Sequence, residues 1–313
     1  MATLLKQRID DRADPRIAAF RDVRDADLRG RDGLFCVESP RIVHRFLHAL
    51  TAAAQGVPCA PRVHIDSLLL SPDTDASLGS LLKALPPACA ARDPLTIFLA
   101  EEHLLSELAG YRMHQGALAL GVRPADTKVT TLLQSLPADS DLIATCGVVH
   151  TDNIGGLFRS AGSFGGVGIL LGDGSSDPLH RKAIRVSSGR VFSVPWAETA
   201  ALESDLQSLQ NMGFALIAAE DTTCAVPIDE ALRLPKVQSA ARRIVVLGAE
   251  GSGVPAAVQS LCHVTACIPM RDSSGLLHDG DRPSLNVATA SAVFLHGLCG
   301  ARRHAGTRLR GRG

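Results

Sequence analysis

The sequence lacks an apolar run long enough to cross a membrane, since none reaches the roughly 18 residues that a spanning helix needs. Its first segment, MATLLKQRIDDRADPR, has no apolar stretch of the kind found in secretory signals, and Asp10 and Asp11 argue against a transit peptide. Hydrophobic residues make up 46% of the chain and charged residues 20%, which is typical of a globular protein. We therefore expect a cytoplasmic protein without a membrane partner.

Cysteine pairs of the CxxC type are also missing. The eight cysteines are scattered, and the nearest two, Cys262 and Cys267, have four residues between them. This spacing argues against a structural zinc site or a thioredoxin-like centre and favours reduced, buried thiols. His44 and His48 lie one turn apart on an expected helix, but the sequence offers them no third ligand nearby, so we expect no metal.

The chain has no net charge, because 32 basic residues balance 32 acidic ones. A polyanionic partner must therefore be argued from local patches. The first basic patch comprises Arg181, Lys182, Arg185 and Arg190. The second lies in residues 301–313 and comprises Arg302, Arg303, Arg308, Arg310 and Arg312. We interpret this second patch as a basic tail, a feature that more often keeps a chain in solution than binds a partner.

Alternating apolar segments predict two α/β domains. The boundaries that we expect are a first domain at 1–124, a linker at 125–140, a second domain at 141–300 and the tail at 301–313. In the first domain, a helix or loose arm at 1–32 precedes expected strands at 34–37, 63–70 and 95–99 and helices near 40–50, 78–85 and 101–110. The second domain should contain a mainly parallel sheet between helices. Its expected strands lie at 142–149, 167–171, 191–194, 214–219, 244–247 and 264–268, and its expected helices near 154–161, 203–212, 253–261 and 284–299.

Three segments of the second domain place polar residues where strands end. In the first, Asn153 stands at the entrance of a helix, where it can cap free backbone N–H groups. The apolar positions of this helix share one face, and they are Ile154, Leu157, Phe158 and Ala161. Arg159 projects from roughly the opposite face and is therefore not a core residue. By itself the segment fits a capped helix with one solvated arginine as well as it fits a site.

The second segment is a glycine-rich turn after the strand at 244–247, a position at which open α/β sheets bind ligands. Gly251, Gly253 and Ala256 match the spacing GxGxxA of dinucleotide-binding turns. Glu250, however, precedes these glycines where a phosphate would feel its negative charge. The turn predicts a ligand site without naming the ligand.

The third segment runs from Ile268-Pro-Met270 to Ser284-Leu-Asn286. A strand ends at the proline, and a helix is expected to begin at Ser284 with Asn286 in its first turn. Small residues then let this helix lie close to a neighbour, and they are Ala288, Ala290, Ser291 and Ala292. Alone, this segment is explained well enough by tight helix packing.

Taken together, the three segments closely resemble the motifs of the SpoU/TrmH-type RNA methyltransferases of the SPOUT superfamily. The matching residues occur in the family's order, as Asn153-x-Gly155-x-x-x-Arg159, Gly248-x-Glu250-Gly251, and Ile268-Pro-Met270 with Ser284-Leu-Asn286. The resemblance covers residues 141–299, including the stretch 177–195 between the first two motifs.

Two parts of the chain resemble the family less closely. Cys36-Val-Glu38-Ser-Pro-Arg41 and His114-Gln115-Gly116 are similar to its N-terminal substrate-binding domain and junction. Arg271 to Pro283 depart from the pattern, because family members commonly have only a few residues between the Ile-Pro-Met and Ser-Leu-Asn segments.

The resemblance implies a trefoil-knotted α/β catalytic domain, an exception to the rule against threaded chains, with a smaller N-terminal α/β domain that binds the substrate. It further implies a homodimer that uses S-adenosylmethionine to methylate the ribose 2'-hydroxyl of ribosomal or transfer RNA.

Residue roles follow from the same resemblance. Arg159 is the candidate for activating the hydroxyl, but a guanidinium hardly ever loses its proton, so we expect it to stabilise the alkoxide or hold a phosphate. The proton acceptor stays unidentified. The other expected catalytic residues are Asn153, Glu250, Ser284 and Asn286. The expected cofactor-binding residues are Leu247, Gly248, Gly251, Ile268, Met270, Leu285 and Asn286. With one Trp and one Tyr in the chain, RNA should be held mainly through phosphates and shape, by Arg41, Arg181, Lys182 and Arg185.

Two alternatives stay open. The first is an RNA-binding protein of the same fold that has lost catalysis, for instance because the 271–283 loop obstructs the cofactor. The second is a nucleotide-dependent oxidoreductase that uses Gly251, Gly253 and Ala256.

Overall fold

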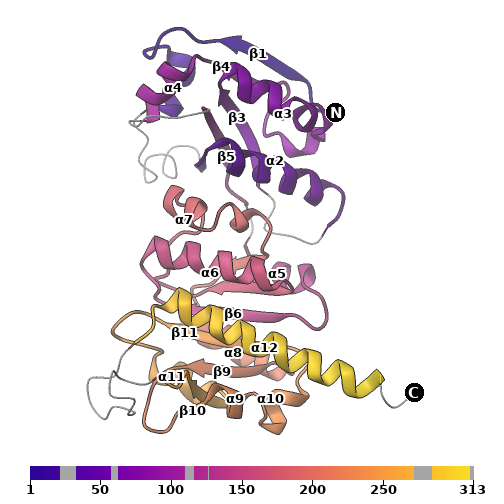
Figure 1. Ribbon diagram of the computed structural model, residues 1–313, viewed down its shortest axis with the longest axis vertical. Helices are drawn as coiled ribbons and strands as arrows, with labels where there is room; N and C mark the ends of the chain where they lie inside the picture. Colours follow the sequence, from indigo (N-terminus) through magenta and orange to yellow (C-terminus); the bar gives the residue numbers. More distant parts are fainter. Residues whose placement is uncertain (22–32, 58–62, 110–115, 126, 271–283, 311–313) are drawn as a thin grey trace. The chain divides into compact units, whose positions relative to one another are not determined.

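The computed structural model describes residues 1–21, 33–57, 63–109, 116–125, 127–270 and 284–310, and of residues 109 and 302–310 it describes the backbone alone (Figure 1). The chain forms two compact units. Unit 1 comprises Met1–Asp126 and Asp177–Ser193, and unit 2 comprises Thr127–Ser176 and Val194–Gly313.

Unit 1 is built on a five-stranded sheet with the order β1-β4-β3-β5-β2. Its strands are β1 (Leu4–Arg8), β2 (Leu34–Glu38), β3 (His64–Leu70), β4 (Leu95–Leu99) and β5 (Ala117–Val122). Strands β1, β4 and β3 are parallel, whereas β5 pairs antiparallel with both β3 and β2. The helical elements are η1 (Pro15–Phe20), α2 (Pro40–Ala54), α3 (Pro72–Ala84), η2 (Pro87–Cys89), α4 (Glu102–Ala109), α7 (Arg181–Val186) and η3 (Arg190–Phe192).

Two strands of unit 1 differ from the expectation. The helix or arm expected at 1–32 contains β1, an edge strand that pairs with β4 and can carry Lys6 and Arg8 because one of its sides faces solvent. Strand β5 was not predicted, since its alanines and glycine have low strand propensity. The strand forms because its burial compensates for this low propensity. The ring of Phe35 occupies the space beside Gly121, only 2.2 Å from where a Cβ on that glycine would lie.

Residues 177–193 belong to unit 1, although the expected second domain was continuous from 141 to 300. The ring of Phe192 lies 4.6 Å from that of Phe46 and 5.8 Å from that of Phe35, measured between centroids. The expected strand at 191–194 is therefore wrong: aromatic burial draws this stretch into η3, and the strand forms later, as β8 (Trp196–Glu198).

Unit 2 contains a seven-stranded sheet with the order β10-β12-β9-β11-β6-β7-β8, and its neighbouring strands are parallel. The strands besides β8 are β6 (Asp141–Cys146), β7 (Val167–Leu171), β9 (Ala215–Ala219), β10 (Val226–Pro227), β11 (Arg243–Gly248) and β12 (Val264–Cys267). The expected parallel sheet is thus confirmed. The helices are α5 (Val129–Ser135), α6 (Thr151–Phe164), α8 (Leu202–Asn211), α9 (Ile228–Ala231), α10 (Pro235–Ser239), α11 (Ala256–Leu261) and α12 (Val287–Arg310).

Helices α6 and α12 pack against each other and run side by side in Figure 1. The contact is close because a Cβ added at Gly156 would lie 2.5 Å from the Cβ of Ala288. Helix α12 continues to Arg310, so the backbone of residues 301–310 extends this helix, whereas we expected a separate tail.

The order of the strands decides where the site lies. Strands β12, β9, β11 and β6 are parallel neighbours, so the loops that follow them leave the sheet at one edge. The loops begin after residues 146, 219, 248 and 267, where β6, β9, β11 and β12 end. The second predicted motif lies at the loop after β11, and the third begins at the loop after β12.

Candidate functional site

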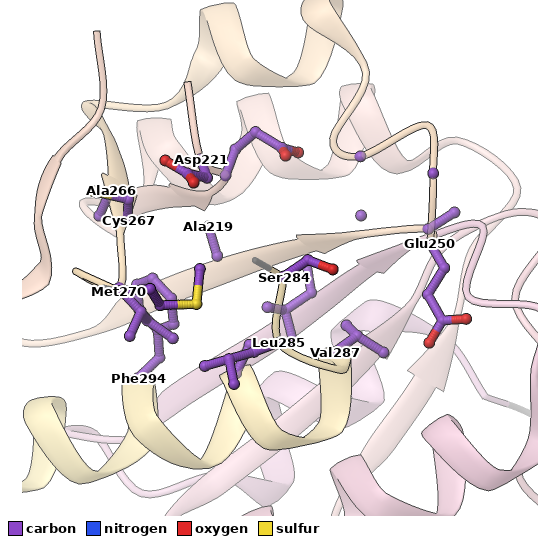
Figure 2. Close-up of a pocket in the computed structure, with 18 residues that line it drawn as sticks. Ala219, Asp221, Glu250, Ala266, Cys267, Met270, Ser284, Leu285, Val287 and Phe294 are labelled. Atoms are coloured by element: carbon purple, nitrogen blue, oxygen red, sulfur yellow. The ribbon is translucent and has the colours of Figure 1, made fainter. Parts of the chain in front are cut away.

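A pocket of about 410 Å³ lies at this edge of the unit 2 sheet, within the range of small-molecule sites. Figure 2 shows Met270, Leu285 and Phe294 at one part of the pocket and Glu250 at another, with Asp221 on the loop after β9. The residues that line the pocket are Ala219, Glu220, Asp221, Leu247, Gly248, Ala249, Glu250, Gly251, Gly253, Ala266, Cys267, Ile268, Met270, Ser284, Leu285, Val287, Ala290 and Phe294.

The glycine-rich turn after β11 folds tightly back on itself. A Cβ at Gly248 would lie 2.0 Å from the carbonyl carbon of Gly253, so this position excludes every side chain. The Gly253 amide donates a 3.0 Å hydrogen bond to the Ala249 carbonyl. From the neighbouring strand end, Glu220 Oε2 accepts the amide of Val254 at 2.7 Å. The turn is therefore fixed both by its own backbone and by Glu220.

Asn153, Glu250 and Asn286 form one hydrogen-bond network at this turn. Asn153 Nδ2 donates to Glu250 Oε1 at 2.8 Å, and Asn286 Nδ2 donates to the same oxygen at 3.2 Å. Asn286 Nδ2 also donates to Asn153 Oδ1 at 2.7 Å. One residue from each of the three predicted motifs thus contributes to a single cluster, and only Glu250 of the three also lines the pocket.

The helix ends near this network differ from the expectation. His150, not Asn153, is the N-cap residue of α6, and Asn153 lies buried in the first turn with its amide in the network. Helix α12 begins at Val287, three residues later than expected. There Asn286 caps the helix through Oδ1, which accepts the Ala288 amide at 2.9 Å.

Arg159 lies on the exposed side of α6, whereas the four apolar positions of this helix are buried, as predicted. It does not line the pocket, and no ion pair or hydrogen bond of its guanidinium is found among the described residues. The structure therefore leaves this side chain available to a partner.

The expected cofactor residues lie together with one exception. Leu247, Gly248, Gly251, Ile268, Met270 and Leu285 line the pocket. Asn286 stands beside the pocket in the polar network, and Ser284, expected to be catalytic, is a lining residue.

Glu220, Asp221 and Phe294 were missed. Glu220 and Asp221 follow the apolar run of β9 directly, so a strand ending in two carboxylates was a signal that the sequence contained. Phe294 gave no such signal, because an aromatic residue inside an amphipathic helix is normally a core residue.

The expected RNA-binding residues lie in unit 1. Arg41, Lys182 and Arg185 are exposed, on α2 and α7. Arg181 is half-buried in an ion pair with the carboxylate of Glu38, so its charge already has a counter-ion within unit 1.

Other expected features lie outside the described residues: His114, Gln115, the loop 271–283 and the arginine side chains of residues 302–312. Within the described part of the chain, no helix is both long and apolar enough to cross a membrane. The same part contains no group of three or more His, Cys, Asp or Glu side chains arranged to hold a metal ion.

Two of the cysteines near the sheet are unreactive at neutral pH. Burial raises the pKa of the Cys146 thiol to about 11 and that of Cys262 to about 12. Because the thiolate is the reactive form, Cys146 acts as a small apolar group of the core, and the partly buried Cys262 packs against it. The expectation of buried thiols holds for Cys36, Cys89 and Cys146 but is wrong for Cys224, which is exposed.

The pocket suits S-adenosylmethionine better than a dinucleotide. Apolar side chains such as Leu285 and Phe294 can cover an adenine ring, and three carboxylates, of Glu220, Asp221 and Glu250, favour the positive sulfonium and ammonium groups. The same carboxylates would repel a pyrophosphate. The oxidoreductase alternative therefore has no support in the chemistry of this site.

Comparison with known proteins gives the same assignment. The SpoU rRNA Methylase family model matches residues 142–296. A protein of Mycobacterium tuberculosis described as an uncharacterized tRNA/rRNA methyltransferase is 29% identical over 308 residues, 96% of this chain and 94% of the relative. A 23S rRNA (guanosine-2'-O-)-methyltransferase of Burkholderia is 26% identical over 82% of this chain and 94% of its own.

The fold has solved counterparts. The AdoMet-bound rRNA methyltransferase of Sinorhizobium meliloti has a TM-score of 0.71 at 18% identity, covering 96% of this chain and 98% of that chain. This likeness supports the α/β architecture. With the family match over residues 142–296, the relatives that align along nearly the whole chain and the clustered motifs, the chain belongs to the SpoU rRNA methylase family.

Proposed function

We propose that this protein methylates the 2'-hydroxyl of a ribose in ribosomal or transfer RNA. The observation that carries the proposal is the network of Asn153, Glu250 and Asn286 beside the pocket, which joins three distant segments through directed hydrogen bonds. The Burkholderia relative, named as a guanosine-2'-O-methyltransferase, supports the ribose as the acceptor.

When bound, S-adenosylmethionine supplies a methyl group that its sulfonium makes reactive toward nucleophiles. The protein then has to align the ribose hydroxyl with this methyl group and to keep other RNA atoms away from it. Leu247, Ile268, Met270 and Leu285 supply apolar walls, and the closed turn at Gly248 supplies backbone that a ligand can approach.

The polar network would position the ribose. Glu250 Oε1 accepts hydrogen bonds from two amide donors, which fixes the carboxylate, and the side chain is 47% exposed, so its other oxygen can accept a further hydrogen bond. Ser284 lines the same pocket and offers a hydroxyl. Arg159, exposed and free of partners among the described residues, would hold a phosphate or stabilise the developing alkoxide, because it cannot accept a proton.

Further parts of this proposal concern the whole molecule. Arg41, Lys182 and Arg185 of unit 1 would contact RNA phosphates, which carry no sequence information but hold the substrate. We also propose, from the family resemblance, that the second domain is knotted, that unit 1 binds the substrate, and that the protein works as a homodimer in the cytoplasm.

The direct test incubates the protein with S-adenosylmethionine and either bulk tRNA or ribosomal RNA, followed by digestion and detection of ribose-methylated nucleosides. Arg159→Ala should lower product formation by roughly a hundredfold, as expected for the loss of a charge-stabilising group. Arg233→Ala is a matched control, because Arg233 is 74% exposed in the same unit and pairs loosely with Asp229.

Two results would contradict the proposal. Wild-type protein that makes no ribose-methylated nucleoside from either RNA would refute it, as would full activity in Arg159→Ala. Calorimetry with S-adenosylmethionine distinguishes an active methyltransferase from an RNA-binding protein of the same fold that has lost catalysis. If the pocket of such a protein were obstructed, it would not bind the cofactor.

A further inference from the structure

The two oxygens of Glu250 have different surroundings. Oε1 accepts hydrogen bonds from the amides of Asn153 and Asn286, whereas Oε2 lies 3.6 Å from Nε2 of His150. The His150 side chain is 66% exposed and that of Glu250 is 47% exposed. The His150 imidazole is therefore open to solvent and also lies next to Glu250 Oε2, while Glu250 Oε1 is held by the two asparagine amides.

His150 is an N-cap residue that does not use its side chain as a cap. No backbone amide of α6 donates to its ring. His180, the N-cap of α7, behaves differently, since its Nδ1 accepts the amide of Lys182 at 3.2 Å. With Nε2 turned toward Glu250, the Nδ1 lone pair of His150 has no donor among the described residues.

We propose that His150, oriented by Glu250, accepts the proton of the RNA hydroxyl during methyl transfer. This inference rests on the proposed ribose 2'-O-methylation and supplies the proton acceptor that it lacks. The 3.6 Å separation is longer than a hydrogen bond, but such pairs commonly tighten when substrate binds.

The other groups at the site are poorer acceptors. Arg159 is a permanent cation. Glu250 Oε1 already accepts two amide hydrogen bonds and Oε2 faces the His150 ring, so this carboxylate is placed to orient an N–H group. Glu220 is occupied by the Val254 amide. A neutral imidazole, by contrast, has a lone pair on one ring nitrogen that can accept a proton.

Glu250 faces His150 from the turn after β11, and Asp152 follows two residues later in the first turn of α6. Asp173 lies on the loop after β7, where Gly174 approaches Gly147. The described ionisable side chains of α12 are His296, which packs on Phe164 at the far end of α6, and Cys299.

The step conserves atoms and charge. The hydroxyl O–H bond breaks, the proton moves to Nδ1 of His150, and the oxygen electron pair forms the new O–CH₃ bond. The C–S bond breaks and its electron pair returns to sulfur, which becomes a neutral thioether. The imidazolium is balanced by the Glu250 carboxylate and then loses its proton to solvent, to which the ring is 66% exposed.

The test measures single-turnover methyl transfer against pH, with S-adenosylmethionine and the RNA that the wild-type protein methylates. For the wild type we expect the rate to rise about tenfold per pH unit and then to level off, because a general base must be unprotonated to act. His150→Gln should lose this rise and fall by about 10² to 10⁴ in rate at the plateau, with S-adenosylmethionine affinity within about twofold.

Two further measurements sharpen the result. His48→Gln, which changes an exposed histidine of α2, should keep the wild-type profile. His150→Ala should recover part of its rate when free imidazole is added. An active wild type with an unchanged rate and profile in His150→Gln would overturn the role of His150 alone. An inactive wild type would overturn the proposed function and this inference together.

Discussion

Asn286 donates its side-chain amide to Asn153 Oδ1 at 2.7 Å, although 133 positions separate the two residues. The same side chain caps α12 through its Oδ1, so one amide group both starts a helix and completes the polar network. The start of α12 is thereby tied to the first turn of α6. The geometry of the site depends on this packing of two helices.

Asn286→Asp separates these two functions. An aspartate keeps the oxygen that accepts the Ala288 amide and caps the helix. It lacks the amide donor, however, and it places a second carboxylate next to Glu250 Oε1, from which Asn286 Nδ2 lies 3.2 Å in the wild type. We expect α12 to form normally by circular dichroism while kcat/KM for methyl transfer falls on the order of a hundredfold. Unchanged kcat/KM would show that the network is structural. Asn286→Ala, which also removes the cap, should cost about 1 kcal/mol more in stability.

Gly156→Ala should destabilise unit 2 although alanine is the better helix former. The new Cβ would lie 2.5 Å from that of Ala288, so α6 and α12 must separate, at a cost of about 1–3 kcal/mol. Gly79→Ala is the matched control in α3, because a Cβ there meets nothing within 4 Å, and it should stabilise by about 0.5–1 kcal/mol. Urea unfolding measures both. Adding Ala288→Gly should relieve the first variant, and a failure of this rescue would contradict the proposed clash.

Asp141→Asn should be strongly destabilising. Asp141 and Arg243 form a buried two-point ion pair at 2.9 and 3.1 Å, with side chains 7% and 5% exposed. Removing one charge leaves the other buried without its counter-ion, which costs about 3–5 kcal/mol. Asp229→Asn, in an exposed pair with Arg233 at 3.5 Å, should cost less than about 1 kcal/mol. Similar losses in the two variants, measured by thermal unfolding, would contradict this.

Stability should fall as the pH drops below about 6.5, and His263 should contribute to the fall. Burial lowers the pKa of His263, and the positive charge of Lys236 lowers it further. The unfolded chain therefore binds this proton at a higher pH than the folded chain does. The stabilisation is complete above the unfolded pKa and is lost as the pH falls toward the folded pKa.

The structure gives a second reason for the same direction, because Nδ1 of His263 accepts the Leu216 amide at 3.0 Å and protonation there would break the bond. His263→Gln should flatten the curve of stability against pH below about 6.5, whereas His48→Gln should not. An identical curve in His263→Gln and wild type would exclude this group as the cause.

Much of the second unit could be read from apolar patterning. Continuous apolar runs predicted the strands at 167–171 and 264–268. Apolar residues at helical spacing predicted the buried face of α6. In the first unit the pattern did not predict β1, because Lys6 and Arg8 made this stretch look like a solvated arm. An edge strand can contain such charged residues, since only one of its sides is buried.

The site was predictable in its residues but not in its connections. The glycine turn and the two asparagines stand out in the sequence, yet the sequence does not reveal that Glu250 accepts from both asparagines or that Glu220 braces the turn. Arg181 shows the converse, since a basic residue that reads as a ligand for phosphate is bound to Glu38.

The sequence by itself determined most of the strands, several amphipathic helices and the family motifs, because these depend on local periodicity and on residue types at short spacing. Tertiary structure alone decided that residues 177–193 join unit 1, that α12 lies against α6, and that His150 meets Glu250. These outcomes depend on strand order and on close approach at Gly156 and Gly248, which bring distant segments together and which no local pattern encodes.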